Sequence, residues 1–228
     1  MTYFSRVSIN PSAVDVKQFA RLACADGYRE HQQLWKLFDD DPDAKRDFLF
    51  RREQTNGWPR FFMVSGRKPE KMDSIWNIET KEYNPKIYSG EKLAFSIRVN
   101  PVVTRTDDDG KKHRHDVVMN MKKQTGYQQL PENKRPPLIQ LAEQAGVEWL
   151  EKRAEKHGFT FDAGAVRIDA YTQNRAYKKR NKHPIRYSTL DFTGVLMVTD
   201  PGIFQTVLYQ GIGPAKAFGC GLLLVRRI

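Results

Sequence analysis

Hydrophobic and polar positions in the first third of the chain follow the periods of short strands and amphipathic helices. Segments rich in aromatic and β-branched residues predict strands at Thr2–Ile9, Phe48–Arg52, Arg60–Ser65 and Ile75–Tyr83. Apolar residues three or four apart predict a helix through Phe19 and another at Tyr28–Phe38. With a turn of helix at Gly66–Met72, the order is β-α-β-β-α-β, which is that of a ferredoxin-like domain.

The same order of elements is expected in the rest of the chain. Apolar runs predict strands at Leu93–Val103, Val166–Tyr171, Tyr187–Val198 and Gly221–Arg227. Helices are expected at Pro137–His157 and Pro201–Gln210, and a charged hairpin at Thr104–His115. The sequence therefore predicts an α+β protein of two tandem ferredoxin-like domains, residues 1–84 and 91–228. No sequence repeat accompanies the doubling, which follows from element order alone.

Two local signals support the first of these domains. Asn56-Gly57 separates two predicted strands and is typical of a tight hairpin turn. Asp26 comes two residues before the predicted second helix and is a candidate for its N-cap.

The composition points to a polyanionic partner. The 228 residues carry a formal net charge of +11, and the pI is about 9.6, which favours nucleic acid or an acidic membrane surface. No apolar run is long enough to span a bilayer, and the first residues lack the pattern of a signal peptide, so a cytoplasmic protein is expected. Cys24 and Cys220 fit reduced, small hydrophobic residues, and no Cys/His spacing indicates a zinc site.

The strongest compositional signal is a basic hairpin, Gln173–Tyr187, expected between two strands. It contains no acidic residue and six cations: Arg175, Lys178, Lys179, Arg180, Lys182 and Arg186. On a hairpin tip these side chains would neutralise phosphates and make the affinity for nucleic acid depend on salt. A solvated, lysine-rich loop is the alternative.

Tyr28 and His31 lie three residues apart on a predicted helix, so they are neighbours on one face. They are near the N-terminus of that helix, which favours an anion such as a phosphate. A histidine transfers protons near neutral pH, and a phenol can position a reacting group or donate a proton. Taken alone, such a pair is more often a packing or surface contact than a catalytic site.

A glycine loop, Gly211–Gly221, contains Lys216 and leads into a short apolar run. Glycine lets another backbone approach closely, and successive N–H groups of such a loop can bind an anion beside the charge of Lys216. An ordinary tight turn before a buried strand is the alternative. The segment matches neither a Walker loop nor a dinucleotide-binding fingerprint.

Two weaker clusters occur in the expected second domain. Arg98, Lys111 and Lys112 are basic, and salt bridges with nearby aspartates are an adequate alternative explanation. His113 and His115 lie close in sequence to several aspartates, but no metal site is expected on a charged hairpin.

Six stretches, taken in order, carry a resemblance to a known family. They are Phe4-Ser5-Arg6-Val7, Tyr28–Phe38, Phe48-Leu49-Phe50-Arg51, Gly90–Pro101, Gly110-Lys111-Lys112 and the glycine loop. Each is weakly specific alone, but together and in this order they are strongly specific. The chain resembles, from end to end, the repeat-RNA endoribonucleases of subtype I-E CRISPR systems, the CasE subunits of the Cascade complex.

The resemblance implies two domains similar to RNA-recognition motifs and metal-independent cleavage of a hairpin repeat in precursor RNA, without a cofactor. It implies that the enzyme stays on its product and joins the other Cascade subunits. Tyr28 and His31 fall at the family's catalytic tyrosine and histidine, with Lys36 or Lys216 as the cation that stabilises the transition state. The basic hairpin would grip the RNA stem. The glycine loop, with Gly213, Gly219 and Gly221, would contact the RNA.

Two other functions are considered. A catalytically silent RNA-binding subunit of such a complex would have the same basic surface, but the presence of His31 favours the enzyme. A DNA-binding protein is supported by the charge alone.

Overall fold

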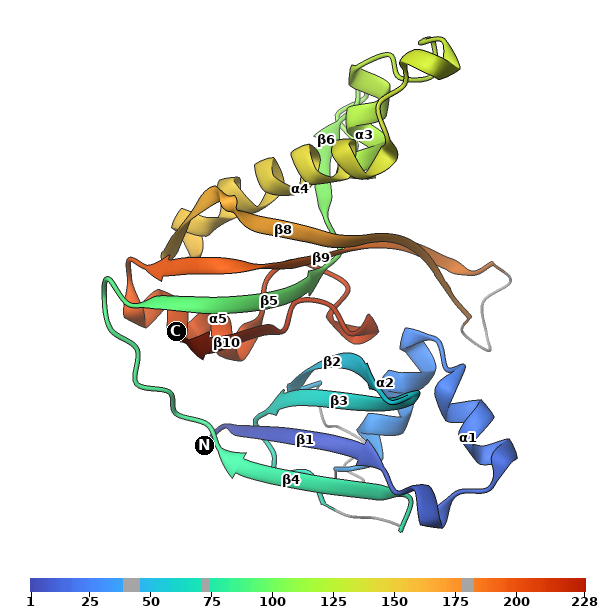
Figure 1. Cartoon of the computed structure of the whole chain (residues 1–228), viewed down its shortest axis with the longest axis vertical. Coiled ribbons are helices and arrows are strands. Elements are labelled where there is room, and N and C mark those ends of the chain that lie inside the picture. Colours follow the sequence, from blue (N-terminus) through green and yellow to red (C-terminus); the bar gives the residue numbers. More distant parts are fainter. Residues whose placement is uncertain (39–45, 71–73, 178–182) are drawn as a thin grey trace. The chain divides into compact units, whose positions relative to one another are not determined.

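The computed structural model describes residues 1–38, 46–70, 74–177 and 183–228 (Figure 1). The chain divides into two compact units. The first unit contains Met1–Lys86, Arg175–Arg186 and Leu208–Leu222, and the second contains Ile87–Asn174, Tyr187–Val207 and Leu223–Ile228. Two late segments thus pack with the first unit, and the division into domains of residues 1–84 and 91–228 stays a prediction.

The first unit contains a four-stranded antiparallel sheet in the order β2-β3-β1-β4. Its strands are β1 (Tyr3–Ile9), β2 (Phe48–Thr55), β3 (Trp58–Ser65) and β4 (Trp76–Glu82). Asn56 and Gly57 join β2 to β3 with φ angles of 50° and 81°, as a two-residue hairpin turn requires. The turn predicted at these residues is confirmed.

Two helices, α1 (Val16–Ala23) and α2 (Gly27–Trp35), pack on this sheet (Figure 1). Leu34 of α2 and the following Phe38 are buried with Phe50 and Met63 of the sheet. Burying a side chain of this size stabilises a fold by about 1.5–3 kcal/mol. This apolar contact fixes where α2 lies on the sheet.

A second four-stranded sheet has the order β10-β5-β9-β8. Its strands are β5 (Lys92–Val99), β8 (Phe159–Ala176), β9 (Ile185–Val198) and β10 (Leu223–Arg227). In both sheets the spatial order is fourth strand, first, third and second. Along the chain of the second unit, helix α4 (Leu138–Ala154) comes between β5 and β8, and α5 (Pro201–Gln210) comes between β9 and β10. The predicted pair of ferredoxin-like folds is confirmed.

An insertion follows β5 in the second unit. It contains the paired strands β6 (Val102–Thr106) and β7 (Lys112–Asp116), then helix α3 (Val117–Gln124). The charged hairpin is confirmed, but α3 is not expected from the sequence. The Asp116 carboxylate accepts the Met119 N–H at 2.7 Å and caps α3, so this short helix has a well-defined start.

Three further expectations differ from the structure. The strand predicted at Leu93–Val103 is divided at Pro101, because proline cannot donate to a ladder of strand hydrogen bonds. Residues 66–70 contain no helix, and the rest of the turn predicted at Gly66–Met72 lies outside the described residues. Cys24 is exposed, whereas Cys220 is buried. Within the described ranges, no helix combines the length and the hydropathy needed to cross a membrane.

Candidate active site

The N-terminus of α2 is fixed by the side chain of Asp26. This residue has extended backbone angles, and its Oδ1 atom accepts the Arg29 N–H at 2.9 Å. The predicted N-cap is therefore confirmed. The cap sets the start of the helix, and so determines which residues of α2 share a face.

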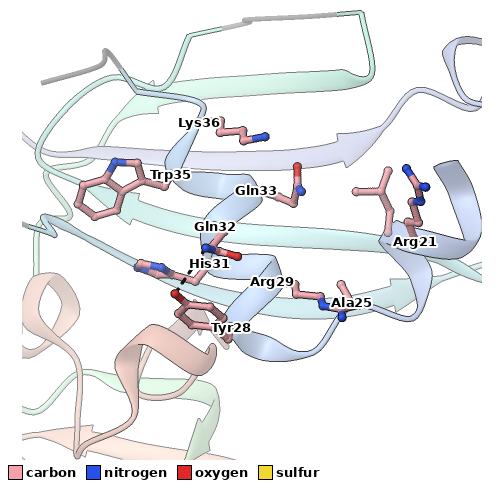
Figure 2. Close-up of a pocket in the computed structure, with 10 residues that line it drawn as sticks. Arg21, Ala25, Tyr28, Arg29, His31, Gln32, Gln33, Trp35 and Lys36 are labelled. Atoms are coloured by element: carbon pink, nitrogen blue, oxygen red, sulfur yellow. Dashed lines mark hydrogen bonds between the residues drawn. The ribbon is translucent and has the colours of Figure 1, made fainter. Parts of the chain in front are cut away.

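Tyr28 and His31 project from the same side of α2 (Figure 2). The His31 ring stacks on Phe48 of β2, with ring centroids 5.2 Å apart and an interplanar angle of 17°, and Trp35 lies at 5.7 Å. The Tyr28 hydroxyl accepts a hydrogen bond from the Gln32 amide at 3.4 Å. Aromatic contacts thus orient the imidazole beside a phenol, an arrangement suited to proton transfer.

This face borders a pocket of about 910 Å³. The pocket is lined by the end of α1, the loop after it and α2: Arg21, Leu22, Ala25, Tyr28, Arg29, His31, Gln32, Gln33, Trp35 and Lys36. Its three cationic side chains are exposed and would attract an anion. Figure 2 shows Lys36 on the opposite side of α2 from the Tyr28 and His31 rings.

The glycine loop packs against the helix that carries Tyr28 and His31. Its 3₁₀ helix η4 (Lys216–Phe218) contacts both α2 and β2. Gly219 has a φ of 76°, and a Cβ there would lie 3.2 Å from the Phe50 ring. Phe50 in turn approaches His31, with ring centroids 6.3 Å apart. The structure therefore brings the loop close to the Tyr28–His31 face through a shared aromatic neighbour.

Lys216 is half-buried in this loop. Burial lowers the pKa of its ammonium group, and the positive charge of Arg46 lowers that pKa further. Burial also lowers the pKa of the Arg46 guanidinium. The effect of Arg46 on the pKa of Lys216 requires the two cations to be near each other, and two adjacent cations suit a phosphate group.

The basic hairpin is partly described. Arg175 and Arg186 are exposed near the ends of β8 and β9, whereas Lys178, Lys179, Arg180 and Lys182 lie outside the described residues. At the base of the hairpin, the Tyr177 N–H donates to Oδ2 of Asp26 at 3.1 Å. The first unit thus contains the pocket, the glycine loop and the base of the hairpin.

The remaining predicted residues belong to the second unit. Both guanidinium contacts of Arg98 to Asp191 measure 2.7 Å, so an ion pair accounts for this side chain. Lys111 lies 4.0 Å from Asp109, and both are well exposed. Lys112 is exposed at the start of β7. The role of these three cations in RNA binding stays a prediction.

Sequence reasoning missed the residues that hold α2 in place. Glu30 is 6% exposed and pairs with Arg52 of β2 at 2.6 Å. Phe48 and Phe50 line one side of His31. The helical spacing of Tyr28, His31 and Trp35 could have indicated a shared face, but no local signal indicates which strand it meets. Among the described residues, no group of three or more His, Cys, Asp or Glu side chains is arranged to hold a metal ion.

Comparisons with known proteins cover almost the whole chain. A model of the family described as CRISPR associated protein matches residues 2–227. The chain is 32% identical to the CRISPR system Cascade subunit CasE of Escherichia coli (strain K12), over 90% of this chain and 94% of that protein. It is 26% identical to the CRISPR-associated endoribonuclease Cse3 of Thermus thermophilus, over 98% and 99% of the two proteins.

A solved structure gives a similar result. The CRISPR endoribonuclease Cse3 bound to 19 nt RNA aligns with a TM-score of 0.70 and 25% identity. The alignment covers 99% of this chain and 98% of that protein, so the similarity includes both compact units.

Proposed function

Because the chain belongs to the family of CRISPR-associated proteins, we propose that it is an endoribonuclease that cleaves hairpin repeats in precursor CRISPR RNA. Relatives named as endoribonucleases align over nearly its full length. One observation in this chain carries the proposal: Tyr28 and His31 share a face of α2 beside a cation-lined pocket, against which a glycine loop packs.

The proposed reaction is attack by a ribose 2′-OH on the adjacent phosphorus. The O2′–P bond forms and the P–O5′ bond breaks, which leaves a 2′,3′-cyclic phosphate and a free 5′-OH. One proton leaves the 2′-OH, and one reaches O5′. His31 transfers one of these protons, a contribution of about 10² to 10⁴ in rate. Tyr28 orients the phosphate or assists the other transfer.

Negative charge builds up on the phosphate oxygens in the transition state. Backbone N–H groups of the glycine loop and a cation stabilise that charge. Two cations are candidates: Lys216 in the loop, and Lys36, which lines the pocket on the opposite side of α2 from the Tyr28 and His31 rings. Neither requires a bound metal, and the reaction as written consumes no cofactor.

The stem of the repeat is recognised by shape and phosphates, because side chains cannot read the deep, narrow major groove of an RNA helix. The basic hairpin supplies these contacts. The enzyme keeps its product and acts as a subunit of a Cascade complex in the cytoplasm, where precursor RNA is available. The name of the E. coli relative, a Cascade subunit, supports this part of the proposal.

The proposal is tested with a labelled hairpin RNA incubated with the protein in EDTA, followed by mapping of the product ends. We expect one cut that leaves a 5′-OH, and no cut when the nucleotide before the scissile phosphate is 2′-deoxy, although that RNA still binds. Cleavage of the deoxy RNA, or loss of all activity in EDTA, would contradict the mechanism. Binding without cleavage of either RNA would identify a catalytically silent subunit.

A further inference from the structure

The carboxylate of Asp26 connects two segments that lie 151 residues apart in the sequence. Its Oδ1 atom closes the N-cap of α2 through the Arg29 N–H, and its Oδ2 atom accepts the Tyr177 N–H at the base of the basic hairpin. One side chain therefore contacts both the helix that carries Tyr28 and His31 and the hairpin proposed to grip the RNA stem.

The loop that carries Asp26 is itself attached to the sheet. Arg52 of β2 donates to the Ala23 carbonyl at 2.7 Å and to the Ala25 carbonyl at 3.4 Å. The same guanidinium pairs with buried Glu30 of α2. Removal of one partner of such a pair strongly destabilises the fold, because the other charge stays buried without compensation. Figure 2 shows Ala25 just before the start of α2. Asp26 thus lies in a segment whose position the sheet determines.

The hairpin side of the contact is anchored as well. Ala176, the last residue of β8, is fully buried, whereas Tyr177 is 57% exposed. The backbone is held at this point, while the tyrosine ring faces outward. The connection through Asp26 therefore joins two fixed points, one on the helix and one on the hairpin.

We propose that Asp26 is a positioning residue that sets the cleavage register of the enzyme. It fixes the distance between the base of the basic hairpin and the Tyr28–His31 face, so that a gripped stem presents a single phosphate to His31. This inference rests on the proposed function. A displacement of about 1 Å between reacting groups can lower a rate by about 10²-fold, so a loosened connection should affect the chemistry more than the binding.

The test separates the two hydrogen bonds of Asp26. Asparagine caps helices as well as aspartate does, but an NH2 donor replaces one of its two oxygens, so the N–H group that faced that oxygen loses its acceptor. Asp26→Asn therefore loses one of the two hydrogen bonds. Asp26→Ser also introduces a residue that caps helices well, but its side chain has only one short hydroxyl to accept an N–H group. Asp15→Asn is the matched control. Asp15 caps α1 through the Gln18 N–H at 2.7 Å, and within the described residues its hydrogen bonds stay inside α1.

Single-turnover cleavage at saturating protein, RNA affinity, thermal unfolding and mapped product ends are measured for all variants. For Asp26→Asn and Asp26→Ser we expect a rate about tenfold lower, an affinity within about threefold of wild type, and additional cuts at neighbouring phosphates. Asp15→Asn should match wild type in rate and cut position.

Two results would overturn the inference. One is a single cut at the wild-type rate in both Asp26 variants. The other is a loss of rate that follows an equal loss of RNA affinity or of folded protein, which would give Asp26 a role in binding or stability instead of register. If the wild-type protein does not cut the hairpin, the proposed function fails on that measurement, before any variant is compared.

Discussion

The imidazole of His31 contacts two other rings: it stacks on Phe48 of β2 and lies beside Trp35 of its own helix. Stacking restricts rotation of the ring, so its nitrogens keep a constant direction relative to α2. A group that is pre-oriented in this way loses little entropy when it transfers a proton. The aromatic surroundings of His31 therefore belong to the proposed site as much as the histidine does.

Removal of this imidazole should abolish one proton transfer. His31→Ala is expected to lower single-turnover cleavage by about 10² or more, with RNA affinity within a few fold of wild type. The control is His157→Ala, which removes a histidine from the 3₁₀ helix η3 (Glu155–His157) outside the pocket. Wild-type cleavage by His31→Ala would rule out the proposed catalytic role.

The lowered pKa of Lys216 predicts a conflict between function and stability. Folding favours the neutral form of this amine, so below the lowered pKa the folded protein holds a charge that the unfolded chain hydrates better. Above the ordinary pKa of 10.5 both states are neutral, and this penalty disappears. Lys216→Met should therefore raise the midpoint of thermal unfolding at pH 7, and the gain should shrink as the pH approaches 10.5.

The same Lys216→Met variant should bind hairpin RNA more weakly at pH 7, because it removes a cation from the proposed phosphate site. Thermal unfolding over a pH series and RNA titration at pH 7 measure the two effects. An unfolding midpoint at pH 7 equal to that of wild type would show that the buried charge is not destabilising.

At the scale of elements, strands and helices with a clear apolar period were predictable. Both sheets and helices α1, α2, α4 and α5 follow from local patterns. Helix α3 is as short as α1, but its apolar residues all lie in its first five positions, Val117–Met121, so no helical period is visible along it. Strand β8 lies at a sheet edge and exposes most of its side chains, so only Val166–Tyr171 showed a strand pattern.

The contacts that assemble the candidate site were less predictable. Tyr28 and His31 could be placed on one helix face from their spacing. The packing of η4 on α2 joins residues more than 180 positions apart, and the bond from Asp26 to Tyr177 is similarly remote. No local period records such contacts, because they depend on how the chain returns to the first unit.

The glycine loop offers a test of its contact with the site. Gly219→Ala places a side chain on a residue with a φ of 76°, which costs roughly 1–2 kcal/mol. The new Cβ would also press on Phe50, a neighbour of His31. We expect a loss of about 1–2 kcal/mol in the free energy of urea unfolding, and a cleavage rate lower by about tenfold.

Gly57→Ala is the matched control for this variant. Gly57 has a φ of 81°, but a Cβ there meets no atom within 4 Å. The backbone penalty should be similar, whereas cleavage should stay at the wild-type rate. If both variants lose stability and activity in the same proportion, the loop acts through general stability alone.

At the scale of the whole molecule, the net charge of +11 leaves two explanations for RNA affinity. Either particular cations contact phosphates, or the overall field attracts the polyanion without defined contacts. The two explanations differ in how affinity changes with salt when a chosen set of cations is removed.

Replacement of Lys178, Lys179 and Arg180 by alanine should weaken RNA binding at physiological salt. It should also flatten the plot of log affinity against log salt, by up to about one unit for each phosphate that the variant no longer neutralises. Cleavage at saturating protein should fall much less, because these residues act on binding.

Alanine at Lys92, Lys152 and Lys156 removes the same charge from exposed positions of the second unit and serves as the control. Equal effects of the two triple variants would mean that only net charge matters. If the plot of log affinity against log salt is the same for the hairpin variant and wild type, the basic hairpin is a solvated loop that does not contact RNA.

The return of Leu208–Leu222 to the first unit also determines when a newly made chain can become active. A ribosome synthesises Met1–Lys86, which contains the first sheet and α2, well before it synthesises the glycine loop. At about 5–20 residues per second, the roughly 120 residues between them take about 6–24 s to synthesise. During that interval Tyr28 and His31 are present on a helix without the loop that packs beside them. The candidate site is therefore complete only once the glycine loop has been made, later than the hairpin proposed to grip the RNA stem.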